Sequence, residues 1–262
     1  MRVWEGGHPR APVLLAVHGL GGSGRYWQGL EGLVGDRFRI LAPDLGGFGR
    51  SAKPRLAAYD RDFHLGALDA IAGGEDGPIT LVGHSLGGVL AELWAGQHPD
   101  RVAGLALCAS PYPEPHPKWD PAHWSGARMV IPGLAANAAR LAWPFVRLPA
   151  QVLSKYPGAV VRDYGRQTLR SRGRTLWSLW SDPSLEAEVR AAAAALKANT
   201  PLLLQHAADD HGVAVANLDR WSALLPSAMT SIVEDGGHQY LLHRRFEPLR
   251  AWLADLPVGG HR

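Results

Sequence analysis

The sequence predicts an α/β protein with a doubly wound, mostly parallel sheet and a helical insertion. Short apolar runs recur through the first 110 residues, and glycine-rich turns and helical patterns lie between them. The runs are continuously apolar, which is typical of parallel strands covered by helices on both faces. After residue 110 this alternation stops, and it resumes near residue 200. Alternation of strands and helices indicates a parallel sheet wound with helices on both sides.

Six apolar runs define the expected strands. They are VLLAV at 13–17, FRILAP at 38–43, ITLVG at 79–83, VAGLALCAS at 102–110, PLLLQ at 201–205 and MTSIV at 229–233. Helical patterns cover 63–71 and 89–98, and an amphipathic helix is expected at 246–256. Each helix therefore follows a strand, as a parallel sheet requires.

Residues 111–199 interrupt this order. They lack a clear buried strand, are rich in proline and tryptophan, and have helical character at 134–148 and 184–198. Five of the ten tryptophans lie here: Trp119, Trp124, Trp143, Trp177 and Trp180. We expect residues 1–110 and 200–262 to form the core domain and 111–199 to form a helical cap over the sheet. The alternative is a set of surface helices that the tryptophans anchor to the main domain.

Composition narrows the classes of function and partner. The 262 residues carry a net charge of +3, and the short cluster Arg170, Arg172 and Arg174 is typical of a solvated surface, so no nucleic-acid partner is predicted. No apolar stretch reaches the roughly 18 residues of a membrane span. The single cysteine, Cys108, excludes an intrachain disulfide, and its place at the end of a buried strand predicts a core residue. With no evident signal peptide, we expect a cytoplasmic protein. The oligomeric state is left open.

The most informative motif is Gly83-His84-Ser85-Leu86-Gly87, directly after one strand and before a helix. A sharp strand-to-helix turn exposes a serine hydroxyl, and small residues beside it avoid clashes with the neighbouring backbone. The N-terminus of the following helix favours a developing negative charge. The motif predicts a nucleophilic Ser85, against the alternative of an ordinary serine at a helix start.

Here the chain resembles the α/β-hydrolase family, along nearly its whole length. That family orders its triad as serine, acid, histidine. After the strand at 201–205, Asp210 matches the acid by its distance from Val213, and Asp209 stays open as an alternative. After the strand at 229–233, His238 follows a glycine pair and matches the base. The resemblance implies an α/β-hydrolase fold with a helical cap insertion.

The resemblance also implies an oxyanion hole of two backbone amides. One is that of Leu86, after the nucleophile, and the other that of Leu20 in HGLGGS at 18–23. This glycine-rich loop lacks the lysine and the spacing of a nucleotide site. In PDLGGFGRS at 43–51, Asp44 occupies a family turn, and a structural role is expected.

A metal site is not predicted from the polar residues at the end of the fifth strand. His206, Asp209, Asp210 and His211 follow one another too closely for all four side chains to converge on one ion. The resemblance implies no cofactor. The triad acid accounts for this cluster better.

The expected function is that of a serine hydrolase, carboxylesterase or lipase-like. It would cleave a carboxylic ester or thioester of a hydrophobic small molecule, with the five tryptophans lining an apolar pocket. The dehalogenase and epoxide hydrolase branches place aspartate where Ser85 stands. Gln239 and Leu86 replace the tryptophans typical of C–C bond hydrolases and proline-specific aminopeptidases. A C–C bond hydrolase, a perhydrolase and a non-catalytic or very slow small-molecule-binding homologue remain alternatives.

Overall fold

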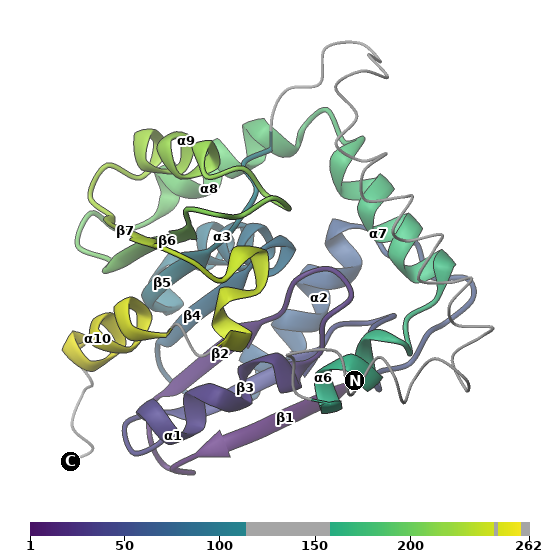
Figure 1. Ribbon diagram of the computed structural model, residues 1–262, viewed down its shortest axis with the longest axis horizontal. Helices are drawn as coiled ribbons and strands as arrows, with labels where there is room; N and C mark the ends of the chain where they lie inside the picture. The colour runs from purple at the N-terminus through teal and green to yellow at the C-terminus, as the bar shows by residue number, and fades with distance from the viewer. Residues whose placement is uncertain (114–157, 244–245, 258–262) are drawn as a thin grey trace.

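The computed structural model describes residues 1–113, 158–243 and 246–257. Its centre is a seven-stranded sheet in the order β1-β3-β2-β4-β5-β6-β7 (Figure 1). The strands are β1 (Arg2–Gly7), β2 (Val13–Val17), β3 (Arg39–Asp44), β4 (Ile79–His84), β5 (Val102–Cys108), β6 (Leu202–Ala207) and β7 (Met229–Val233). β1 pairs antiparallel with β3, and the other pairs are parallel. The predicted fold class is confirmed.

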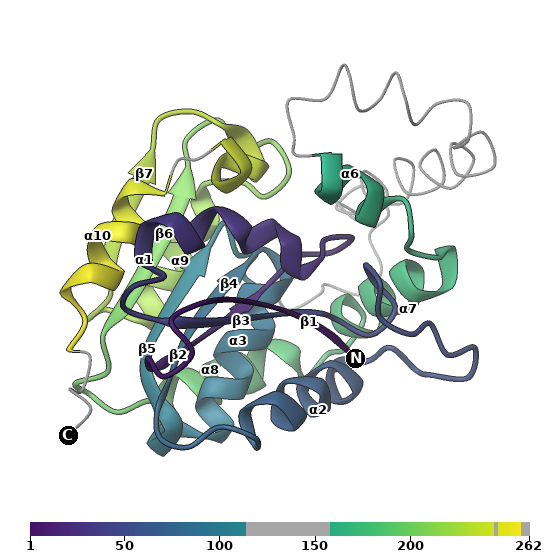
Figure 2. The ribbon, with the colours of Figure 1, turned by 90° about the horizontal axis from the view of Figure 1, so that it is seen from below.

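Helices cover both faces of this sheet. The helices of the described part are η1 (Gly24–Leu30), α1 (Glu31–Val34), α2 (Arg61–Ala72), α3 (Leu86–Gln97), η2 (Pro99–Arg101), α6 (Gly158–Tyr164), α7 (Leu169–Trp180), α8 (Leu185–Ala195), α9 (Ala216–Leu224), η4 (Gly237–His243) and α10 (Glu247–Asp255). Figure 2 shows α2, α3 and α8 on one side of the sheet and α1 on the other.

Strand β2 shows why the apolar runs are continuous. Leu15 and Val17 belong to the core cluster shared with α2, α3, α8 and α9. Leu14 and Ala16 belong to the cluster shared with η1, α1, η4 and α10. Successive side chains of a strand point to opposite faces, so a strand covered on both faces needs apolar residues at every position.

The range expected to form the cap is described only from residue 158 onwards, and its segment 134–148 lies outside the described residues. The helix expected at 184–198 is α8, and it packs directly against α3. A side chain added at Gly96 of α3 would meet the Cα of Ala192 at 2.3 Å. α8 therefore lies in the helical layer next to the sheet. The division into core and cap stays a prediction.

No helix in the described part of the chain is both long and apolar enough to cross a membrane. The longest described helices, α2, α3 and α7, have 12 residues each. Spanning a bilayer takes about 20 apolar residues.

Helix α3 is buried on all sides, and this burial encloses a carboxyl group. Residues 86–95 are all buried, Glu92 completely so. Neither carboxyl oxygen of Glu92 has a hydrogen-bond partner among the described residues. Burial raises the pKa of Glu92 well above its usual value, because the charged form loses its hydration. The folded protein therefore holds a proton at Glu92 that the unfolded chain releases near pH 4.

We expect Glu92→Gln to stabilise the protein increasingly as pH rises. An acid whose folded pKa is raised loses stability as pH climbs through the range between its unfolded and folded pKa values. Glutamine resembles the neutral carboxyl group and removes this loss. The difference in Tm between the variant and the wild type should widen from pH 5 to pH 8. Glu234→Gln, at an exposed position, is the matched control. A difference that stays constant with pH would contradict the raised pKa of Glu92.

Cys108 should be unreactive in the native protein. It is fully buried at the end of β5, and burial raises the pKa of its thiol to about 12. Because the thiolate is the reactive form, burial and the raised pKa both keep the native thiol from reacting at pH 8. Iodoacetamide should leave the native chain unmodified and alkylate one cysteine per chain in urea, as mass spectrometry can count. Equal alkylation rates in both states would show an accessible thiol.

Candidate active site

Ser85 occupies a strained turn between β4 and α3. Its backbone angles are φ 55° and ψ −125°, a conformation that residues other than glycine rarely adopt. This turn is sterically possible because the residues next to it are small. A side chain at Gly83 would lie 2.3 Å from the carbonyl oxygen of Gly87, and one at Gly87 would lie 2.3 Å from that of Val17. The glycines of the motif are therefore required by the close approach of α3 to β2 and β4.

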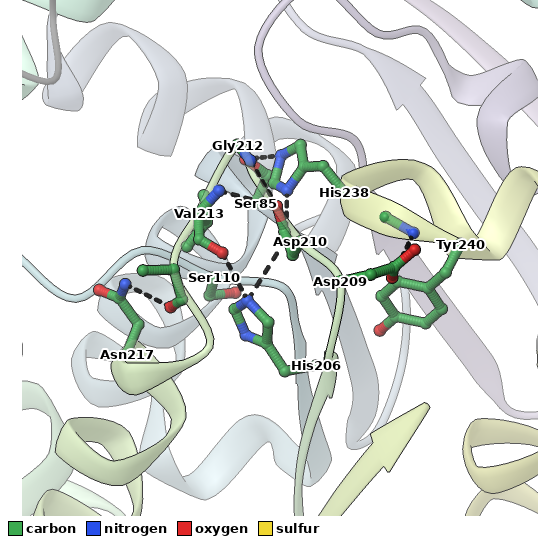
Figure 3. Close-up of polar contacts among 12 residues, drawn as sticks. Ser85, Ser110, His206, Asp209, Asp210, Gly212, Val213, Asn217, His238 and Tyr240 are labelled. Carbon is green, nitrogen blue, oxygen red and sulfur yellow. Dashed lines mark hydrogen bonds and ion pairs between the residues drawn. The ribbon is translucent and has the colours of Figure 1, made fainter. Parts of the chain in front are cut away.

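The structure brings the three predicted triad residues together (Figure 3). The hydroxyl Oγ of Ser85 lies 3.0 Å from Nε2 of His238. Nδ1 of His238 lies 2.8 Å from Oδ2 of Asp210. The serine follows β4, the aspartate follows β6, and the histidine is the second residue of η4, after β7. All three lie beyond the carboxyl ends of parallel strands, where ligand sites of open α/β sheets form.

Asp210 is held as an ionised acceptor. Its Oδ1 accepts the backbone N–H groups of Gly212 at 2.7 Å and Val213 at 2.8 Å. Burial raises the pKa of Asp210, but hydrogen bonds from His206 and His238 and the charge of His238 outweigh burial, so the pKa lies well below its usual range. The carboxylate therefore carries its charge throughout the neutral pH range.

Asp209 points to different partners. Its carboxylate accepts the backbone N–H of Gly237 at 2.8 Å and that of Gly236 at 3.2 Å. These two glycines precede His238, so Asp209 holds the loop that presents the imidazole. Of the two alternatives that the sequence left open, Asp210 is the one in contact with His238.

His206, which the sequence analysis rejects as a metal ligand, contacts Asp210. Its buried Nε2 donates to the carbonyl oxygen of Val213 at 2.9 Å and lies 3.3 Å from Oδ2 of Asp210. Figure 3 shows its ring below the carboxylate, on the side away from His238. Among the described residues, no group of three or more histidine, cysteine, aspartate or glutamate side chains could hold a metal ion.

His84, the variable residue of the serine motif, binds the backbone of His238. Its Nε2–H donates to the carbonyl oxygen of His238 at 2.7 Å, and its ring stacks on Tyr26 with centroids 4.7 Å apart. Burial, and then the nearby His238, hold the pKa of His84 well below its usual value. A neutral ring with its proton on Nε2 fits this contact. The motif alone contained no signal for it, because the partner lies 154 residues away.

The loop 18–23, called the oxyanion loop after the role that the sequence predicts for it, runs beside Ser85. A side chain at Gly19 would lie 2.9 Å from Cβ of Ser85. The loop begins at His18, whose Nδ1–H donates to the carbonyl oxygen of Gly19 at 2.7 Å and whose Nε2 accepts the N–H of Leu45 at 3.0 Å. Burial lowers the pKa of His18, so a neutral ring joins the loop to the end of β3. Leu20 is therefore the residue directly after Gly19, which lies against Ser85.

Asp44 has the structural role expected of it. Its Oδ1 accepts the N–H of Gly24 at 2.7 Å, and its Oδ2 accepts the N–H of Arg50 at 2.6 Å. The carboxylate therefore joins the start of η1 to the turn after β3.

The predicted substrate-binding tryptophans are described only in part. Trp119, Trp124 and Trp143 lie outside the described residues. Trp177 lies on α7 and is 55% exposed, whereas Trp180 is partly buried against the core cluster of α2, α3 and α8. Their contact with a substrate stays a prediction.

Known proteins resemble this chain over most of its length. A family model described as alpha/beta hydrolase fold matches residues 12–242. The chain is 41% identical over 101 residues to lipase LipV of Mycobacterium tuberculosis, covering 38% of each chain. It is 32% identical over 179 residues to a haloalkane dehalogenase of Bradyrhizobium diazoefficiens, covering 63% of this chain and 56% of the relative.

The structure is also similar to a solved thioesterase domain from the curacin biosynthetic pathway. The TM-score is 0.73 at 20% identity, covering 96% of this chain and 94% of that domain, and this likeness supports the fold alone. The chain spans 29%, 38% and 56% of the length of three curated relatives that it matches. Because the family model extends from residue 12 to residue 242, the chain belongs to the α/β-hydrolase fold family.

Proposed function

We propose that the chain is a serine hydrolase that cleaves a carboxylic ester or thioester of a hydrophobic small molecule. One observation carries the proposal: Ser85, His238 and Asp210 form a continuous hydrogen-bonded chain of 3.0 Å and 2.8 Å. A serine hydroxyl is a weak nucleophile at neutral pH, and a hydrogen-bonded imidazole that is itself held by a carboxylate activates it.

The reaction would proceed in two halves. Oγ of Ser85 attacks the carbonyl carbon while Nε2 of His238 accepts the hydroxyl proton. The tetrahedral intermediate carries its negative charge on the former carbonyl oxygen, next to the amides of Leu86 and Leu20. The intermediate collapses, the alcohol or thiol leaves with the proton from His238, and an acyl-enzyme remains. Water then attacks the acyl group with His238 as base, which releases the acid and restores Ser85.

Asp210 would fix the tautomer of the base. Because its ionised carboxylate accepts Nδ1–H of His238, the lone pair of Nε2 faces Ser85. The same charge stabilises the imidazolium that forms in each half of the reaction. The two backbone N–H groups on its other oxygen keep the carboxylate from rotating away.

Haloalkane dehalogenation is disfavoured by the nucleophile. One relative of this chain is a haloalkane dehalogenase. If Ser85 displaced a halide from an alkyl carbon, the product would be an alkyl ether, which water at a histidine does not cleave. A carboxylate nucleophile would instead give an ester, which can be hydrolysed. The serine therefore favours acyl transfer, and the lipase relative supports the same reaction class.

A fluorophosphonate probe should label Ser85 in the wild type, and Ser85→Ala should abolish both labelling and hydrolysis. The measurements are mass spectrometry of the labelled peptide and rates on p-nitrophenyl esters and thioesters of increasing acyl length. Rates that rise with apolar chain length would support the hydrophobic substrate class. Ser181→Ala, at an exposed position, is the control. A wild type that neither labels nor hydrolyses any of these compounds would exclude the serine hydrolase and favour a non-catalytic binding protein.

The two aspartates should differ sharply when each is replaced by asparagine. Asp210→Asn should lower kcat by about 10⁴, because the amide stabilises the wrong tautomer of the histidine. Asp209→Asn keeps a carbonyl oxygen for the N–H of Gly237, so it should change kcat by only about two- to threefold. Steady-state kinetics on one ester decide between them. If Asp209→Asn lowered kcat more than Asp210→Asn, the assignment of Asp210 as the acid would be wrong.

A further inference from the structure

Helix α6 lies against the oxyanion loop, although α6 belongs to the range predicted to form the cap. Figure 1 shows α6 beside η1, which follows the loop, and the two elements are in contact. Asp163 of α6 is fully buried, as is Ser23 at the end of the loop. The hydroxyl of Ser23 donates to Oδ2 of Asp163 at 3.1 Å. A carboxylate 140 residues away therefore holds the end of the oxyanion loop.

The middle of the loop is covered by the same segment. Gly21 has a φ of +81°, and a side chain there would meet the ring of Tyr164 at 2.8 Å and the amide of Gln167 at 3.0 Å. These two residues follow Asp163 closely in the chain. The segment 158–167 thus packs on the loop next to Leu20.

The carboxylate of Asp163 is itself fixed by charge. Its Oδ1 accepts from the guanidinium of Arg166 at 2.7 Å, and its Oδ2 lies 3.7 Å from Nε of Arg25. A buried carboxylate requires such partners, because desolvation of an unpaired charge is costly. Its hydrogen bond to Ser23 is charge-assisted and so stronger than one between neutral groups.

The loop is therefore held at two ends by different parts of the molecule. At its start, His18 donates to the carbonyl oxygen of Gly19 within the loop and accepts the N–H of Leu45 from the core. At its end, Ser23 is bound to Asp163, and the following residue, Gly24, is bound to Asp44 of the core. Leu20 lies between these anchors. Among the described residues, Asp163 is the anchor that comes from the range 111–199.

We propose that Asp163 is a positioning residue for the oxyanion hole, which sets the place of the Leu20 amide through Ser23. The proposal rests on the proposed function, since it assigns Leu20 as a donor. The charge on the oxygen develops only in the transition state, so displacement of this amide lowers kcat more than it changes KM. A residue of the predicted cap thereby takes part in setting the rate of acyl transfer.

The test compares Asp163→Ala, Ser23→Ala and the double variant with the wild type. Each single variant should lower kcat for a short ester by about ten- to a hundredfold with KM within about twofold, since misplacing a donor costs less than removing it. The double variant should be no slower than the slower single variant, because both break one contact. The rate of fluorophosphonate labelling at Ser85 should fall in parallel. Asp163→Asn keeps an acceptor for Ser23 and should restore most of kcat.

Asp182→Ala is the matched control. Asp182 also lies in the predicted cap, but its described partners are Arg61 and Ser184, which are not part of the loop, so kcat should stay at the wild-type value. If Asp163→Ala does not fold, Ser23→Ala carries the comparison. An active wild type with unchanged kcat in the folded variants, or an equal loss in Asp182→Ala, would overturn the role of Asp163. An inactive wild type would instead overturn the proposed function.

Discussion

The closeness of the turn after β4 to the end of β2 is the constraint on which the site depends. The two strands are parallel neighbours, with Val17 opposite Gly83. On the other side, the N–H of Ser85 is bound to the carbonyl oxygen of Cys108 at 2.8 Å. The strained backbone of Ser85 is thus held from both sides by strands that cannot move apart without breaking the sheet. Strain of this kind persists only where the surroundings fix it.

Burial helps to determine which side chains around this turn are charged. It holds the pKa values of His18 and His84 below their usual range, so both rings are neutral and serve as hydrogen-bonding links. The carboxylate of Asp210 stays ionised because hydrogen bonds outweigh its burial. His238 is placed between this fixed negative charge and the hydroxyl of Ser85. Among these three histidines, His238 alone contacts both the Asp210 carboxylate and the Ser85 hydroxyl, while the rings of His18 and His84 bind backbone groups.

Much of the fold could be predicted from the sequence, because strands covered on both faces are apolar throughout. β1 could not, since RVWEGG is only half-buried, ends in two glycines and so lacks an apolar run. The motifs predicted Ser85 and His238 through the spacing of glycines around them. Asp209 and Asp210 are adjacent, so the distance to Val213 favours Asp210 but leaves Asp209 open, and the hydrogen-bond partners distinguish the two. The roles of His84, His206 and Asp163 depend on contacts between distant segments, which no local pattern contains. The sequence predicts the helix α8, but it does not predict the contact of α8 with α3.

The enclosure of Cys108 has a practical consequence. The chain has one cysteine, and that thiol is sealed between β4 and β6 in the centre of the sheet. Thiol-directed dyes and spin labels should therefore not react with the native surface of the described part. A cysteine introduced on α6 and another on η1 would carry a distance-reporting pair of labels without removal of the native Cys108. The separation of these two elements, and hence the packing of the segment 158–167 on the oxyanion loop, can then be measured directly in solution.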